Sequence, residues 1–154
     1  MRKQLKDNPL EYTRRQIVNM YVREMGEWVR TFPGEFFEAI YRLEGWQFDP
    51  NNHQHSPRVG RLIAELVYDC LPPGVYKRLK EENPVDEKGR RKHCHHQFLT
   101  DEVGRKELRK QIDWIVEHAE YCPTMETLLH AAKVRRRKLY GDEPYVIEGR
   151  QYQQ

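Results

Sequence analysis

Apolar residues recur every three or four positions along most of the chain, and this spacing predicts short amphipathic helices. The first helix is expected to begin at Asn8-Pro9, a residue pair typical of a helix start. Its apolar face contains Ile17, Tyr21, Met25 and Trp28. The pattern therefore predicts one helix from Pro9 to the end of this stripe.

Proline and glycine residues divide the rest of the chain into further helices. Trp46 follows a glycine at one helix end and is expected to fold back on that helix. A turn is expected at residues 86–89, within a small β-hairpin near residues 86–98. The remaining helices are expected from Pro33 to Gly45, Ser56 to Cys70, Val75 to Asn83, Thr100 to Ala119 and Thr124 to Tyr140.

These elements predict a mostly α-helical fold, a compact bundle of about five to six short helices. A single helical domain is expected over residues 1–141, followed by a polar C-terminal tail at residues 142–154. The length of 154 residues is enough for one domain with a real core.

Composition narrows the class of protein. Charged residues make up 33% of the chain, yet the net charge is only +3, and 11% of the residues are aromatic. A disordered chain would have few aromatic residues, and no apolar run is long enough for a membrane span. The charged N-terminus does not resemble a signal peptide. We therefore expect a soluble cytoplasmic domain.

The three cysteines are Cys70, Cys94 and Cys122, and they contain no Cys-x-x-Cys pair. This pattern argues against a disulfide framework. Cys70 and Cys122 lie in apolar helical patterns and are expected to be buried. The common nucleotide-binding and hydrolase motifs do not occur in the sequence, which weakens the case for an enzyme.

The most unusual stretch is residues 89–98, GRRKHCHHQF, in which basic residues run into histidines. One interpretation is a zinc site, since imidazole is a good Zn²⁺ ligand. A second is acid–base catalysis of phosphodiester cleavage, with Arg90, Arg91 and Lys92 on the phosphate. A third is a binding surface or a structural element. The candidate metal ligands are His53, His55, His93, His95 and His96.

A second basic cluster occupies residues 133–138. Its candidate binding residues are Arg135, Arg136, Arg137 and Lys138. Cations near a helix C-terminus also complement the helix dipole, so a solvated helix end is the alternative interpretation. Several aromatic residues have the helical spacing of core positions, which favours packing over base stacking. These residues are Trp28, Phe36, Phe37, Tyr41 and Trp114.

The stretches FPGEFFEAIYRLEGW, VYDCLPPGVYKRLKEENPVDEKGRRKHCHHQFLTDEVGRKELRKQI and WIVEHA together carry a resemblance. From about Tyr21 to about Lys133, the chain resembles the small C-terminal domain of phage and prophage antirepressor-type proteins. That family usually has Lys where this chain has Cys94 and Trp where it has Phe98. It often has His at the position of Arg105. These departures weaken a catalytic or metal-binding interpretation.

The resemblance implies a phage- or prophage-encoded regulatory binding protein. We expect it to dock on a repressor, a host defence protein or another regulator, through Arg90–His96 and secondarily through Arg135–Lys138. The alternatives are a histidine-dependent, metal-assisted nuclease or phosphodiesterase, and a direct DNA- or RNA-binding module. We expect no cofactor except the zinc of the alternative interpretation, and no membrane partner. The sequence leaves the partner and the oligomeric state open.

Overall fold

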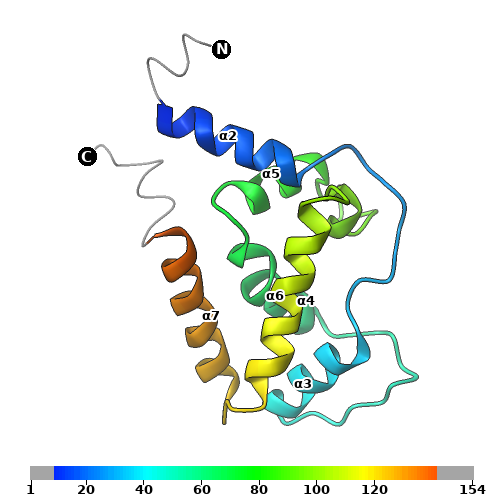
Figure 1. The fold of residues 1–154 in the computed structure, drawn as a ribbon. Helices are drawn as coiled ribbons and strands as arrows, with labels where there is room; N and C mark the ends of the chain where they lie inside the picture. Colours follow the sequence, from blue (N-terminus) through cyan, green and yellow to red (C-terminus); the bar gives the residue numbers. More distant parts are fainter. Residues whose placement is uncertain (1–8, 142–154) are drawn as a thin grey trace. The chain divides into compact units, whose positions relative to one another are not determined.

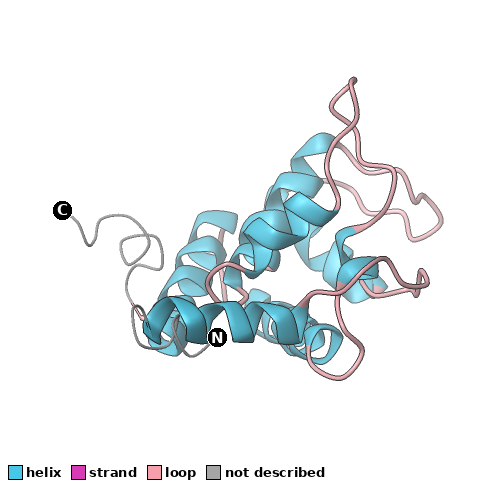
Figure 2. Ribbon diagram, turned by 90° about the horizontal axis from the view of Figure 1, so that it is seen from above, coloured by secondary structure: helices cyan, strands magenta, loops and turns pink. Residues whose placement is uncertain are grey.

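In the computed structural model, residues 9–141 are described, and their side chains from residue 13 onward. The described residues contain six α-helices and two 3-10 helices, joined by loops (Figures 1 and 2). This confirms the predicted mostly α-helical fold. The predicted tail at 142–154 lies outside the described residues. The helices are α2 (Pro9–Tyr21), α3 (Gly34–Glu44), α4 (Pro57–Leu66), η1 (Tyr68–Cys70), α5 (Val75–Glu82), η2 (His95–Phe98), α6 (Gly104–Ala119) and α7 (Met125–Tyr140).

The chain divides into two compact units. Among the described residues, unit 1 comprises residues 9–29 and 72–106, and unit 2 comprises residues 30–71 and 107–141. Helix α6 begins in unit 1 and continues in unit 2. The single domain expected over residues 1–141 stays a prediction.

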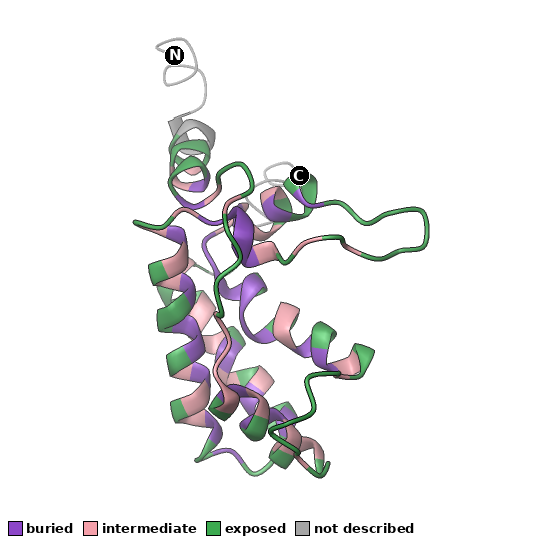
Figure 3. Cartoon of the chain, turned by 90° about the vertical axis from the view of Figure 1, so that its right-hand side faces the viewer, coloured by how far each residue is buried: buried purple, intermediate pink, exposed green. Residues whose placement is uncertain are grey.

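Unit 2 is built from α3, α4, η1, most of α6 and α7, and the apolar stripes seen in the sequence form its core. Buried positions recur along the helices at intervals of three and four residues, which is the pattern of a one-sided helix (Figure 3). Its fully buried side chains include Phe36, Ile40, Val59, Leu62, Leu66, Val67, Leu108, Ile112, Ile115 and Leu128.

Two helices of unit 2 begin or end at the capping residues that the sequence predicts. Gly45 adopts a φ of 77°, a left-handed conformation that glycine tolerates and that ends α3. The Trp46 N–H then donates to the Tyr41 carbonyl at 2.8 Å, and the two rings pack edge to face at 5.3 Å. At the start of α7, the Thr124 hydroxyl accepts the Thr127 N–H at 3.1 Å. The predicted return of Trp46 onto its helix is confirmed.

In unit 1, α2 ends at Tyr21, so the prediction that this helix continues to Trp28 is wrong. Residues 22–29, which we call the strap, instead run beside residues 97–100. The Arg23 N–H donates to the Phe98 carbonyl at 2.8 Å, and the Gly26 N–H donates to the Gln97 carbonyl at 2.7 Å. Because these backbone groups pair with a distant segment, the strap leaves the helix.

The predicted place of Trp28 in the core is also wrong. On the strap, the Trp28 side chain is 59% exposed and that of Met25 is 49% exposed. Helical spacing placed both residues on the buried face of α2, but the helix ends before it reaches them. The two apolar side chains are therefore left at the surface.

The expected hairpin is reduced to a turn with one bridge. The Asp86 N–H donates to the Arg90 carbonyl at 2.6 Å, and Val85 and Arg91 form an isolated antiparallel bridge. Gly89 has a φ of 77°, as this turn requires. Beyond Arg91 the chain winds into η2 instead of continuing as a strand. A capping box between Cys94 and Gln97 stabilises that 3-10 turn.

Thr100 links the end of α2 to the start of α6. Its hydroxyl donates to the Met20 carbonyl at 2.5 Å and accepts the Gly104 N–H at 2.8 Å. Its own N–H donates to the Tyr21 carbonyl at 2.8 Å. Helix α6 therefore begins at Gly104, four residues later than the sequence pattern predicts.

Cys70 and Cys122 are buried, as predicted, while Cys94 is exposed. None of the helices within residues 9–141 combines the length and the apolar character that a membrane span needs.

We predict that Gly104→Ala destabilises the protein by about 1–3 kcal/mol, because the new methyl group would overpack its site. It would meet the Tyr21 carbonyl oxygen and lie 2.9 Å from the Leu99 Cβ. Gly60→Ala, in the middle of α4, is the matched control because a Cβ there meets nothing within 4 Å. That change should stabilise by about 0.5–1 kcal/mol. Chemical denaturation would contradict this packing if both variants unfolded at the same midpoint.

Candidate functional site

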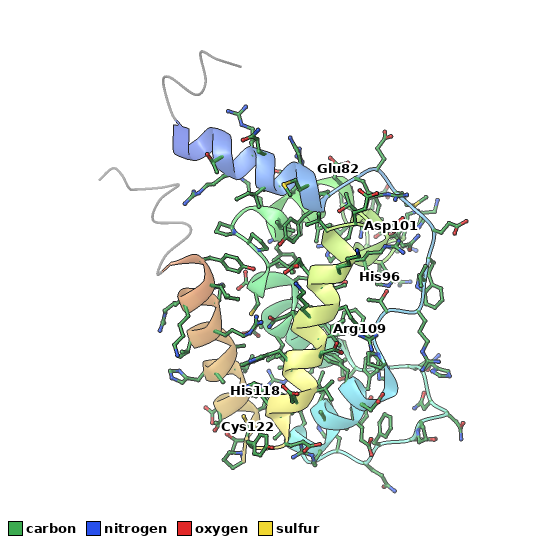
Figure 4. All side chains as sticks on the ribbon, in the orientation of Figure 1. Glu82, His96, Asp101, Arg109, His118 and Cys122 are labelled. Carbon is green, nitrogen blue, oxygen red and sulfur yellow. The ribbon has the colours of Figure 1, made fainter. Side chains whose placement is uncertain are left out.

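The segment Arg90–Phe98, which we call the histidine segment, has two kinds of side chain. Arg90, Lys92 and Cys94 are exposed, whereas Arg91, His93 and His95 are half-buried. His96 is only 4% exposed, and Gln97 and Phe98 beside it are also buried. The segment thus presents cations to solvent and turns its last residues inward. Figure 4 labels His96 on this segment, with Glu82 at the end of α5 and Asp101 before α6.

Asn83, at the end of α5, holds the histidine segment in place. Asn83 is only 3% exposed, and its Nδ2 donates to the His93 carbonyl at 2.9 Å. The same Nδ2 lies 3.2 Å from His95 Nδ1, and the Asn83 carbonyl accepts from an Arg91 guanidinium nitrogen at 3.1 Å. An amide NH₂ only donates, so His95 Nδ1 accepts and its ring proton lies on Nε2.

His95 lies among aromatic and cationic side chains. Its ring packs edge-on against Tyr76 at 5.8 Å, and the Lys80 ammonium lies 4.3 Å from the centre of the Tyr76 ring. Burial lowers the pKa of His95 to about 4, and the positive charges of Arg91 and Lys80 act in the same direction. His95 is therefore neutral at pH 7, which agrees with an Nδ1 that accepts a hydrogen bond.

His96 is also held neutral. Burial lowers its pKa to about 4, and the nearby Arg105 guanidinium acts in the same direction. Its ring centre lies 6.2 Å from that of Trp28 on the strap. Arg105 in turn donates to the Glu27 carbonyl at 2.8 Å. His96 is thus part of the packing between the strap and the histidine segment.

Gln97 ties the histidine segment to the strap with both ends of its amide. Its Oε1 accepts the Cys94 N–H at 3.0 Å, and its Nε2 donates to the Gly26 carbonyl at 3.3 Å. The Gln97 carbonyl accepts the Gly26 N–H in return. This buried side chain satisfies backbone groups that no sheet or helix serves.

The candidate metal ligands do not form a ligand set within the described part of the chain. No group of three or more His, Cys, Asp or Glu side chains there is placed to hold a metal ion. His53 is exposed in unit 2. His55 stacks on Phe37 at 4.3 Å and shares a 2.8 Å hydrogen bond with the Tyr41 hydroxyl. The zinc interpretation therefore has no support from the placement of these residues.

The second basic cluster, in α7, separates into inward and outward residues. Arg135 donates to Gln111 Oε1 at 2.7 Å and lies over the Trp114 ring. Arg136 donates to the carboxylate of Asp69 at 3.0 Å and to its carbonyl at 3.2 Å. Two of the four predicted binding residues thus have partners within unit 2. Arg137 and Lys138 are exposed.

Sequence reasoning missed the residues that organise the site. Asn83-Pro84 was recognisable as a helix end, but its buried amide depends on where the next turn returns. Nothing in the sequence distinguishes Gln97 from other polar residues. The sequence carries one signal for the surroundings of this site. Tyr76 and Lys80 are four residues apart, so both lie on the same face of α5.

A family model described as the p63C domain matches residues 17–108, more than half of the chain. The chain belongs to the p63C domain family. The members of this family are phage and mobile-element domains, which confirms that broader part of the resemblance. Comparison with curated proteins and with solved structures gave no significant match.

The family match covers the strap, Asn83 and the whole histidine segment. It ends within α6 at Leu108 and does not reach the basic cluster of α7. The histidine segment is thus a feature of the p63C part of the chain.

We predict that the free energy of unfolding decreases as pH falls from about 6.5 to about 4. An unfolded histidine has a pKa near 6.5, whereas those of folded His95 and His96 are about 4. Between these values the unfolded chain binds more protons, so acid favours unfolding, and above pH 6.5 this contribution is complete. With screening of half-buried His95 taken into account, the loss between pH 7 and pH 5 is about 2 kcal/mol.

The measurement is urea denaturation at pH 7 and pH 5. His95→Gln should flatten the dependence, whereas His53→Gln, at an exposed position, should leave it unchanged. An identical pH dependence in the wild type and in His95→Gln would contradict the assignment.

Proposed function

We propose that this chain is a phage- or mobile-element-encoded regulatory binding protein of the antirepressor type. It acts by docking on a repressor, a host defence protein or another regulator. Membership of the p63C family supports the genetic setting of this proposal. The proposed docking surface is the histidine segment together with the strap.

The observation that carries the proposal is that neutral, packed side chains and exposed cations occur together within the histidine segment. His95 and His96 are neutral and engaged in packing, while Arg90 and Lys92 project from the same backbone into solvent. A general acid near pH 7 needs a pKa close to that pH, which these two imidazoles lack. Two exposed cations on one short segment can contact an acidic protein surface together, so the arrangement favours docking.

The neighbouring strap favours a protein as the partner. Exposed Trp28 and Met25 belong to residue types enriched in protein–protein interfaces, as do arginines. Charge agrees with a protein partner. The described part of unit 1 has 12 Lys and Arg against 9 Asp and Glu, and that of unit 2 has 11 against 11. Such a small excess of positive charge favours only weak sequence-independent binding to nucleic acid.

The test uses the tagged full chain in cells that carry the encoding phage or mobile element, followed by mass spectrometry. The charge-reversed variant Arg90→Glu/Lys92→Glu should recover at least about tenfold less of the partner, since its charges now repel an acidic surface. Arg91 is left intact because it donates to the Asn83 carbonyl. The matched control is Arg61→Glu/Lys106→Glu, which reverses an exposed arginine and lysine elsewhere.

The enriched protein is then purified, and its affinity is measured directly for all three chains. Equal recovery by the wild type and by Arg90→Glu/Lys92→Glu would contradict the proposed surface. Cleavage of DNA or RNA by the purified wild type would support the nuclease alternative instead.

A further inference from the structure

Lys80 and Arg91 are two cations of unit 1 that contact the neighbours of His95. Lys80 comes from α5, and Arg91 follows the turn at residues 86–89. Arg91 and His95 both bond to Asn83, at 3.1 Å and 3.2 Å, and the Lys80 ammonium lies 4.3 Å from the centre of the Tyr76 ring that packs against His95. Within residues 13–141, neither Lys80 nor Arg91 forms an ion pair. Both cations therefore remain available for an ion pair with an acidic group from outside the described residues.

The two cations are held in place by neutral contacts. A guanidinium nitrogen of Arg91 donates to the carbonyl of buried Asn83, which leaves the other N–H groups of its planar fork for a further acceptor. The Lys80 ammonium lies over the face of the Tyr76 ring. These contacts orient both cations before any ligand arrives, which lowers the entropic cost of binding.

We propose that Lys80 and Arg91 form a binding site for a single acidic side chain, Asp or Glu, of the partner protein. This inference rests on the proposed docking function, extends the docking surface to Lys80 of α5, and names the chemistry that is recognised there. A carboxylate fits because an arginine fork binds it through two parallel hydrogen bonds, and a nearby ammonium adds a third interaction. Asn83 is then a positioning residue, because it acts on the ligand through Arg91.

The surroundings favour one carboxylate over the backbone of a nucleic acid. Exposed acids follow Lys80 directly, at Glu81 and Glu82, and two more occupy the turn before Arg91, at Asp86 and Glu87. A nucleic acid carries a phosphate at every step, so its neighbouring charges would be repelled there. One acidic side chain on an otherwise neutral peptide avoids this repulsion.

The experiment follows the NMR signals of the ¹⁵N-labelled full chain, with the Arg91 Nε–H as the main reporter. The probes are the peptide acetyl-Leu-Glu-Ala-Leu-amide, its neutral counterpart acetyl-Leu-Gln-Ala-Leu-amide, and a short single-stranded DNA. We expect the acidic peptide to shift the Arg91 signal and the neutral peptide to leave it in place. Raising the salt concentration should weaken binding of the acidic peptide, since the site is accessible to solvent.

Variants separate the site from general electrostatic attraction. Arg91→Gln should weaken binding of the acidic peptide by about tenfold, since it removes a charged hydrogen-bond donor. Lys80→Gln should also weaken it, and it should leave the folded structure intact because this side chain is exposed. Lys77→Gln, one turn earlier on α5, and Arg61→Gln are matched controls that should bind as the wild type does.

Equal shifts with both peptides, or wild-type affinity in Lys80→Gln and Arg91→Gln, would overturn the site. A shift of Arg91 by DNA but not by the acidic peptide would overturn it in favour of a phosphate ligand. The outcome is separable from the proposed function. Recovery of a regulator without peptide binding refutes only this site, whereas peptide binding without any recovered regulator refutes only the regulatory role.

Discussion

Unit 1 depends on one buried amide, the side chain of Asn83. The residues between α5 and α6 form neither a sheet nor a long helix, so their backbone groups must find partners individually. Asn83 bonds to the His93 carbonyl, His95 and Arg91, and thereby fixes the start of the histidine segment. Gln97 and Thr100 then join the far end of that segment to the strap and to α2. The side chains of Asn83, Gln97 and Thr100 thus form hydrogen bonds to backbone groups that neighbouring strands would satisfy in a sheet.

In this arrangement, the histidines that suggested catalysis pack inside unit 1 and support the backbone that carries the exposed cations. Neutral imidazoles pack well and accept hydrogen bonds, whereas imidazolium rings in the same places would lose solvation among arginines. The charge remains on Arg90, Lys92, Lys80 and Arg91, at or near the surface. The proposed docking function and the proposed carboxylate site both follow from this separation of neutral interior and cationic rim.

Much of the fold could be predicted from local signals. Gly45, Ser56-Pro57 and Thr124 mark helix ends through their own backbone preferences and side chains, which need no tertiary information. The strap could not be predicted, because the stripe of Ile17 and Tyr21 continues in register to Trp28. Only pairing with residues about 75 positions away ends α2. The same limit applies to the site: the histidine segment was identifiable, but the inward turn of His96 and Arg136 depends on distant partners.

The central claim is that His95 is neutral, with its Nδ1 accepting a hydrogen bond from Asn83 and its proton on Nε2. A long-range ¹H–¹⁵N correlation spectrum, recorded from pH 7 down to pH 4, measures both the tautomer and the titration directly. We predict an unprotonated Nδ1 that accepts a hydrogen bond at pH 7, and protonation of His95 only near pH 4. A His95 that is protonated on Nδ1, or that titrates near its ordinary pKa of about 6.5, would contradict the account.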